Sequence, residues 1–304
     1  TGVQTCALPI FTEQVFGGNP LAVFPSAQGL DTAEMQQIAK ELNLSETTFV
    51  LPATKKDAAV RVRIFTIDRE LPLAGHPVVG TAFALAATGG IAVREGNQRV
   101  QLELGSGVLP VDIEVREGKV RSVVMTQRPP AFGPSLTDAR RLAAALSLAP
   151  EQIDLDTLPA RVVDTGIPWL LIPVKDRRAL AAVRADAKLC AALAREVGTD
   201  LFHAFTLDSL DPDCAVSTRH VWWGTVTPGE DPVTGSAIGC IASFLVGEGV
   251  MLASPEARFS IEQGASVGRP GKVHARIGAS GGKVTSVQIG GAAVHVGTGE
   301  LWVP

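Results

Sequence analysis

Two carboxylates, Glu46 and Asp231, are the residues of this sequence best placed to do chemistry. Glu46 lies where a helical stretch leads into an apolar strand, and a half-buried carboxyl group there can take a proton and return it in one turnover. Asp231 lies in a loop shortly before Gly235. We predict that Glu46 is an acid/base and that Asp231 either orients a substrate hydroxyl or amine or carries a second proton. The structural alternatives are a glutamate at a surface turn and a loop aspartate that accepts backbone N–H bonds.

Two glycines, Gly75 and Gly235, stand where apolar helical stretches begin. The first N–H groups of a helix have no partner within it and the helix dipole is positive there, so such an end can bind an anion. Glycine lets a ligand carboxylate approach the backbone, and His76 and Ser236 add hydrogen-bonding side chains. We predict that both helix starts hold the carboxylate of a small ligand. The alternative is that glycine and proline only mark where the helices begin.

The chain contains an internal duplication, which predicts where these residues lie. Four pairs of segments recur in the same order: Gly18–Pro25 with Gly166–Pro173, Ile38–Leu42 with Leu193–Val197, Glu70–Gly75 with Glu230–Gly235, and Gly118–Val123 with Gly282–Val287. Glu46 corresponds to Leu201 in the second copy, and Asp231 corresponds to Leu71 in the first. Two similar halves form a cleft between them, and one unmatched acid from each half suits an asymmetric reaction there.

The predicted fold class is α/β (α+β), with two pseudo-symmetric domains at 11–127 and 128–304 divided by a stretch rich in proline and glycine, and the last strand is able to pack back on the first domain. The helices that begin at Gly75 and Gly235 are apolar on every side, so each domain is expected to wrap a curved mixed sheet or barrel around one buried helix. Asp31 and Glu34 predict a capping box for a peripheral helix that ends near Leu42. Strands are predicted at 16–25, 48–51, 60–65, 100–104, 111–115, 120–125, 259–262, 273–277 and 284–289.

Residues 1–10 match neither a signal peptide nor the duplication. They read like the in-frame translation of a sequencing adapter. We therefore interpret them as a non-native segment outside the fold, with the native sequence continuing from Phe11.

Composition excludes several classes of function. An apolar fraction of 46% with 19% charged residues is typical of a soluble globular protein, and no apolar run reaches the length of a membrane span. A net charge of -4 with scattered basic residues predicts no nucleic-acid binding. Cysteines and histidines show no metal-ligand or disulfide spacing, so no metal is predicted and a reducing cytoplasm is expected. The sequence has no serine-hydrolase elbow, P-loop or dinucleotide-binding glycine motif.

Several motifs taken together resemble the PhzF family of phenazine-biosynthesis-type proteins. They are Phe16–Phe24, Leu44–Phe49, Leu73–Pro77, Glu230–Ala237, and Gly264 with Gly268–Pro270. The resemblance runs from about Phe11 to the C-terminus, and this set of motifs in this order is highly specific.

The resemblance implies the diaminopimelate-epimerase-like fold, a site between two α/β domains, no cofactor and frequently a homodimer. In the phenazine enzyme the glutamate that corresponds to Glu46 moves a proton across dihydro-hydroxyanthranilate, and the residues that match His76 and Asp231 contact the substrate. Related two-thiol epimerases place a cysteine before each helix-start glycine. Those positions are Ala74 and Thr234 here, which disfavours a thiol-based racemase.

The function predicted from sequence is a cofactor-independent isomerase of a small, cyclic amino or hydroxy carboxylic acid. Glu46 is its acid/base, with Asp231 and His76 orienting the substrate. Gly75, Gly235 and Ser236 hold the carboxylate, and Asn19 is a further candidate contact. Two alternatives stay open at this point: a non-catalytic protein that binds a small molecule or a partner, and an epimerase that uses Glu46 and Asp231 as two bases.

Overall fold

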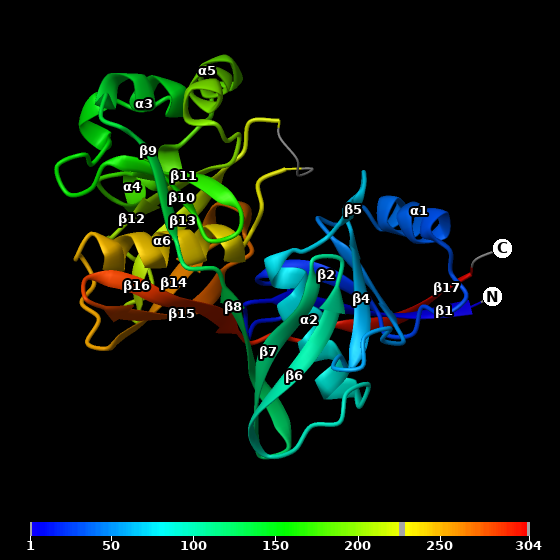
Figure 1. The fold of residues 1–304 in the computed structure, drawn as a ribbon. Helices are drawn as coiled ribbons and strands as arrows, with labels where there is room; N and C mark the ends of the chain where they lie inside the picture. Colours follow the sequence, from blue (N-terminus) through cyan, green and yellow to red (C-terminus); the bar gives the residue numbers. More distant parts are fainter. Residues whose placement is uncertain (1, 225–228, 303–304) are drawn as a thin grey trace. The chain divides into compact units, whose positions relative to one another are not determined.

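The computed structural model describes residues 2–224 and 229–302. The chain divides into two compact units, of which unit 1 comprises residues 1–126 and 290–304 and unit 2 comprises residues 127–289 (Figure 1). The C-terminal segment therefore belongs to the same unit as the N-terminal segment. Over the described residues, no helix is both long enough and apolar enough to cross a bilayer.

Unit 1 is built on a mixed sheet. Its strands are β1 (Gly2–Ile10), β2 (Asn19–Phe24), β3 (Thr47–Leu51), β4 (Val60–Phe65), β5 (Glu70–Leu71), β6 (Gly96–Leu104), β7 (Gly107–Arg116), β8 (Lys119–Gln127) and β17 (Gly297–Trp302). The pairs β17–β1, β1–β2, β3–β4, β6–β7 and β7–β8 are antiparallel, and β2–β3 and β4–β6 are parallel. The short strand β5 pairs antiparallel with β4.

The two helices of unit 1 have different roles. Helix α1 (Thr32–Leu42) has the predicted capping box, since Asp31 and Glu34 each accept the other's backbone N–H, and its apolar face covers Phe24 and Phe49 of the sheet. Helix α2 (Gly75–Thr88) is buried from His76 to Ala86 and contacts β1, β2, β3, β4 and β7. Figure 1 shows α2 running behind β6 and β7 of the same unit. The prediction of a central helix surrounded by strands is confirmed.

Unit 2 repeats this plan. Its strands are β9 (Ala131–Leu136), β10 (Ala160–Asp164), β11 (Pro168–Pro173), β12 (Phe202–Thr206), β13 (Cys214–Val221), β14 (Glu256–Gln263), β15 (Gly271–Ser280) and β16 (Lys283–Gly291). Its helices are α3 (Ala139–Leu146), α4 (Arg177–Ala182), α5 (Ala187–Val197) and α6 (Gly235–Gly247), with 3-10 turns η1 (Pro150–Gln152) and η2 (Ala265–Val267). Helix α6 is the buried helix of this unit and packs on β10, β11 and β15.

The duplication is visible in the strand pairing. In unit 1 the strands β1, β2, β3, β4, β6 and β7 pair in turn as antiparallel, parallel, antiparallel, parallel and antiparallel. In unit 2 the strands β10, β11, β12, β13, β14 and β15 pair in the same alternation. Helices α1 and α5 connect the first parallel pair of each unit, and α2 and α6 connect the second. Each parallel pair thus has a crossover helix, as parallel pairing requires.

The structure corrects the interpretation of the first ten residues. Residues 2–10 form β1, which pairs with both β2 and β17 and holds the place in unit 1 that β10 holds in unit 2. Its side chains Cys6, Leu8 and Ile10 are buried. The exclusion of residues 2–10 from the fold and from the duplication is therefore wrong. β1 resembles β10 in its strand pairing and in the alternation of its side chains, and a comparison of residue types does not detect this resemblance.

Candidate active site

Glu46 lies directly before β3, and its side chain is 14% exposed. Side chains alternate between the two faces of a strand, so Glu46 lies on the same face as Thr48. The Thr48 face is turned toward α2, because the Oγ1 of Thr81 in that helix donates a hydrogen bond to the Oγ1 of Thr48 at 2.8 Å. The register of β3 thus directs Glu46 toward the buried helix.

His76 is the second residue of α2 and is 6% exposed. Its Nε2 lies 3.1 Å from Oε2 of Glu46. That distance suits a hydrogen bond, although the two groups are poorly aligned for one in this arrangement. The predicted acid/base and one predicted substrate contact therefore touch each other.

Asn19 determines which nitrogen of His76 carries the proton. As the fully buried first residue of β2, it brings its Nδ2 to 3.3 Å from Nδ1 of His76. An amide nitrogen can only donate, so Nδ1 must be the acceptor, and a neutral His76 ring then carries its hydrogen on Nε2, which faces Glu46. Asn19, His76 and Glu46 thus form one directed chain of side chains.

The start of α2 presents backbone donors beside this chain. The residue before the helix, Ala74, has extended backbone geometry and no side chain able to cap the first amides. In α6 the corresponding residue is Thr234, and among the described residues no side chain caps that helix either. Both predicted anion-binding ends therefore begin without the side-chain cap that most helices use.

Asp231 is 9% exposed, and its carboxylate is held from within its own loop. The Oγ1 of Thr234 donates a hydrogen bond to Oδ2 of Asp231 at 2.7 Å. This contact fixes the direction of a buried negative group immediately before α6.

Gly235 and Ser236 begin α6 and are each held by a polar side chain. The Nε2 of Gln127 donates to the carbonyl of Gly235 at 3.1 Å, and the indole N–H of Trp169 donates to Oγ of Ser236 at 3.1 Å. Because Oγ accepts that bond, its own proton is directed elsewhere. A serine hydroxyl held in this way can donate to an anion at the helix tip.

The structure thus gathers the predicted residues into two sets. Unit 1 brings together Asn19, Glu46, His76 and the amide end at Gly75, and unit 2 brings together Asp231, Gly235 and Ser236. Sequence reasoning missed the residues beneath the second set, because they lie far away in sequence and carry no motif. They are His203, His220 and Gln263, all buried, together with Trp169, which appeared only as part of the duplication.

None of the four cysteines belongs to either set. Cys6, Cys190, Cys214 and Cys240 are free and buried. Desolvation raises the pKa of Cys190 and of Cys240 to about 12 and that of Cys214 to about 11, which suppresses the reactive thiolate. Ala74 and Thr234, which precede the two helix-start glycines, provide no thiol.

One acidic cluster in unit 2 has the ligand types of a cation site. Asp211, Cys214 and Glu262 bring their side-chain ligand atoms within 4.8 Å of one another. However, Nζ of Lys272 lies 2.7 Å from Asp211, and Glu262 accepts backbone N–H bonds from Leu210 and Asp211. A lysine and two amides already provide the positive groups that a cation would supply.

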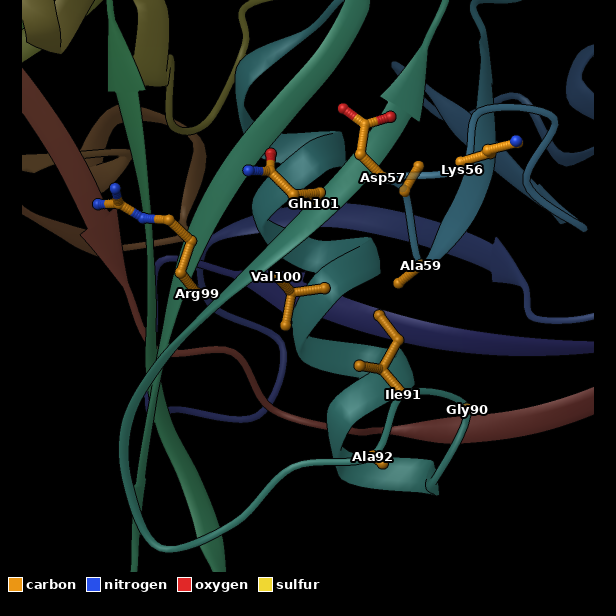
Figure 2. Close-up of a pocket in the computed structure, with 10 residues that line it drawn as sticks. Lys56, Asp57, Ala59, Gly90, Ile91, Ala92, Arg99, Val100 and Gln101 are labelled. Atoms are coloured by element: carbon orange, nitrogen blue, oxygen red, sulfur yellow. The ribbon is translucent and has the colours of Figure 1, made fainter.

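A surface depression of about 540 Å³ lies elsewhere on unit 1 (Figure 2). Its lining consists of residues 56–59, 90–92 and 99–101 and contains none of the predicted site residues. Gly90 and Ile91 follow the last turn of α2, so about 20 Å of helix separates this depression from His76. In Figure 2 Lys56 and Arg99 extend in opposite directions, and Arg99 is engaged by Asp112 at 2.7 Å.

Comparison with known sequences identifies the family. The family model described as phenazine biosynthesis-like protein, PhzC-PhzF, matches residues 8–299. A protein of Mesorhizobium japonicum named an uncharacterized isomerase is 34% identical over 97% of each chain. The trans-2,3-dihydro-3-hydroxyanthranilate isomerase of Pseudomonas aeruginosa is 31% identical over 96% of this chain and 97% of that protein.

Comparison with solved structures agrees. The phenazine biosynthesis protein of the PhzF family from Bacillus anthracis superposes with a TM-score of 0.91 at 27% sequence identity, and the match covers 100% of each chain. The fold implied by the sequence motifs, two α/β units of diaminopimelate-epimerase type, is therefore confirmed.

Proposed function

This chain belongs to the phenazine biosynthesis-like PhzF family and is an isomerase, and from that premise we propose that it moves a proton within a small cyclic amino or hydroxy carboxylic acid. We propose Glu46 as the group that carries the proton. The substrate class is taken from the P. aeruginosa relative, whose name specifies a cyclic compound with amino, hydroxyl and carboxylate groups.

The observation that carries the proposal is the contact between Glu46 and His76 at the start of α2. A carboxylate that is 14% exposed, 3.1 Å from an imidazole nitrogen and at the uncapped end of a helix, has the access and the orientation that an acid/base requires. Nε2 of His76 faces Glu46, and Asn19 holds that ring at Nδ1.

The proposed reaction needs one carboxylate and conserves atoms and electrons. Ionised Glu46 takes a proton from one carbon of the ring, and the electron pair of that C–H bond forms a double bond. An existing double bond shifts, and its terminal carbon takes a proton from Glu46, whose partly exposed carboxyl exchanges its proton with water before the transfer. No oxidant, reductant or leaving group takes part, so the product is an isomer of the substrate.

The remaining predicted residues bind the substrate in this proposal. The amide ends at Gly75 and Gly235 and the hydroxyl of Ser236 are donors suited to a carboxylate, and Asp231 is an acceptor suited to an amine or hydroxyl. These are the polar groups that an amino or hydroxy carboxylic acid would require.

The proposal is tested by measuring turnover of trans-2,3-dihydro-3-hydroxyanthranilate and of a panel of cyclic amino and hydroxy carboxylic acids. We expect wild-type protein to isomerise at least one of them and Glu46→Gln to lose roughly a hundredfold to ten-thousandfold in kcat. Glu41→Gln, which changes an exposed glutamate at the end of α1, is the matched control and should keep wild-type turnover. Full activity in Glu46→Gln would refute the role of Glu46.

A further inference from the structure

The loop that carries Asp231 is held by two consecutive residues of β13. The guanidinium of Arg219 donates to both oxygens of Glu230 at 2.9 and 2.8 Å. The next residue of the strand, His220, accepts the backbone N–H of Asp231 through Nδ1 at 2.9 Å. Neighbouring strand residues thus hold neighbouring loop residues, and the register of β13 sets the position of Asp231.

A second attachment comes from Gln263, the last residue of β14, which is 4% exposed. Its Nε2 donates to the carbonyl of Asp231 at 2.8 Å and to Oγ1 of Thr234 at 3.1 Å, and its Oε1 accepts the backbone N–H of Thr234 at 2.9 Å. Because Oγ1 of Thr234 accepts from Gln263, its hydroxyl proton points to Oδ2 of Asp231. The amide of Gln263 therefore orients the carboxylate through Thr234.

The bond from Asp231 to His220 requires a neutral imidazole. Nδ1 accepts a hydrogen, so the ring hydrogen must be on Nε2, and a second proton would occupy the acceptor site. Around this ring lie the His203 ring, stacked at 6.3 Å, the edge of Trp169 at 5.7 Å, and the charge of Glu230. Trp169 also donates to Ser236, so the same buried layer contacts both polar side chains of this set.

We propose that His220, Gln263 and Thr234 are positioning residues that hold the Asp231 carboxylate in the orientation needed for turnover, with His220 acting in its neutral form. This inference rests on the proposed function, in which Asp231 contacts the substrate. Its physical basis is that three buried side chains hold Asp231. His220 binds its N–H, Gln263 binds its C=O, and Thr234 binds one carboxylate oxygen.

The first test compares paired substitutions at Thr234. Thr234→Val is nearly isosteric and removes the hydroxyl, whereas Thr234→Ser keeps it. We expect Thr234→Val to lower kcat by roughly tenfold to a hundredfold with little change in KM, because a displaced group costs turnover of that size. Thr234→Ser should keep most of the wild-type kcat. Thr206→Val, at a buried threonine of β12 in the same unit, controls for general destabilisation.

The second test observes the bond directly. In uniformly ¹⁵N-labelled protein at neutral pH, we expect a coupling across the hydrogen bond between the Asp231 amide nitrogen and Nδ1 of His220. His220→Leu should lose that scalar coupling and should lose turnover. His220→Asn should keep more turnover, because its side-chain oxygen can accept the same N–H.

The outcomes separate the two proposals. If wild type turns over its substrate and Glu46→Gln does not, but Thr234→Val and His220→Leu keep wild-type kcat, the positioning role is refuted while the proposed function stands. A missing coupling, or an Nδ1-protonated His220, refutes the positioning role whatever the activity. Full activity of Glu46→Gln refutes the proposed function.

Discussion

The proton on His76 is the residue-scale feature on which the chemistry of unit 1 depends. Through its Nδ2, Asn19 donates to Nδ1, and a neutral ring then carries its hydrogen on Nε2 toward Glu46. In Asn19→Asp the side chain has the same shape but accepts, which draws a proton to Nδ1. We expect kcat to fall at least about tenfold, since an imidazole in the wrong tautomer is a poor catalytic partner.

The measurement for Asn19→Asp is steady-state turnover together with the ¹⁵N chemical shifts of the His76 ring. Wild-type protein should show Nε2 protonated and Nδ1 not, and the variant should show Nδ1 protonated. Unchanged turnover with a reversed tautomer would show that turnover does not depend on which nitrogen of His76 carries the hydrogen.

At this scale the sequence predicted the site residues that lie in recognisable motifs, and it missed the residues that hold those side chains in place. Glu46, His76, Asn19 and Asp231 were named from local sequence and from the family resemblance. His220, interpreted as a satisfied or exposed histidine, and Gln263 could not be given this role, because they reach Asp231 only through the register of β13 against β14, where Thr218 pairs with Gln263. A residue type by itself does not show such a long-range contact.

At the scale of elements, β1 and α2 meet at a position where an added side chain would force neighbouring side chains to shift. A Cβ at Gly80 of α2 would lie 2.5 Å from Cδ1 of Ile10 and 2.6 Å from Cδ2 of Leu21, both buried. We expect Gly80→Ala to destabilise unit 1 by about 1–3 kcal/mol through overpacking, which exceeds the gain in helix propensity of about 1 kcal/mol.

Urea unfolding of Gly80→Ala followed by circular dichroism checks this prediction. Adding Ile10→Val, which removes the Cδ1 that would clash, should recover part of the loss. No recovery would contradict the packing of β1 against α2. The experiment also tests whether β1 belongs to the fold, since a segment outside the fold could not rescue a core helix.

The elements themselves were well predicted wherever apolar periodicity and caps agree. The capping box of α1 and the two fully apolar helices lie where the sequence placed them. β1 was missed because it resembles β10 in its strand pairing and not in its residue types. Its pairing partner β17 also lies at the other end of the chain, so local sequence does not show the pair.

At the scale of the whole molecule, the buried imidazoles of unit 2 predict how stability changes with pH. Desolvation lowers the pKa of His220 from 6.5 to about 4 and that of His203 well below its usual value. Below about pH 6.5 the unfolded chain binds protons that the folded protein excludes, so the free energy of unfolding falls as pH drops toward 4. The contribution of His220 is on the order of 3 kcal/mol, present in full above pH 6.5 and lost by pH 4.

Urea unfolding at pH 7 and pH 5 measures this effect through tryptophan fluorescence, because Trp169, Trp222 and Trp223 all lie in unit 2. His220→Asn removes the titrating ring and should show a smaller loss of stability between the two pH values than wild type. An equal loss in both proteins would mean that His220 is not the group responsible.

The prediction that both sets of residues serve one ligand came from the duplication, with one unmatched acid in each half. It belongs to the proposed function. The duplication explains why the fold could be predicted in detail from sequence, whereas the identity of the substrate depends on loop shapes that no repeat encodes.

The most direct test of the account is the position of deuterium in product formed in D₂O. If Glu46 carries the proton, wild-type protein should place solvent deuterium at the carbon that gains hydrogen, while Glu46→Gln should bind the substrate and incorporate none above background. Product formed by Glu46→Gln with the same deuterium content and at the wild-type rate would contradict the central claim that this carboxylate moves the proton.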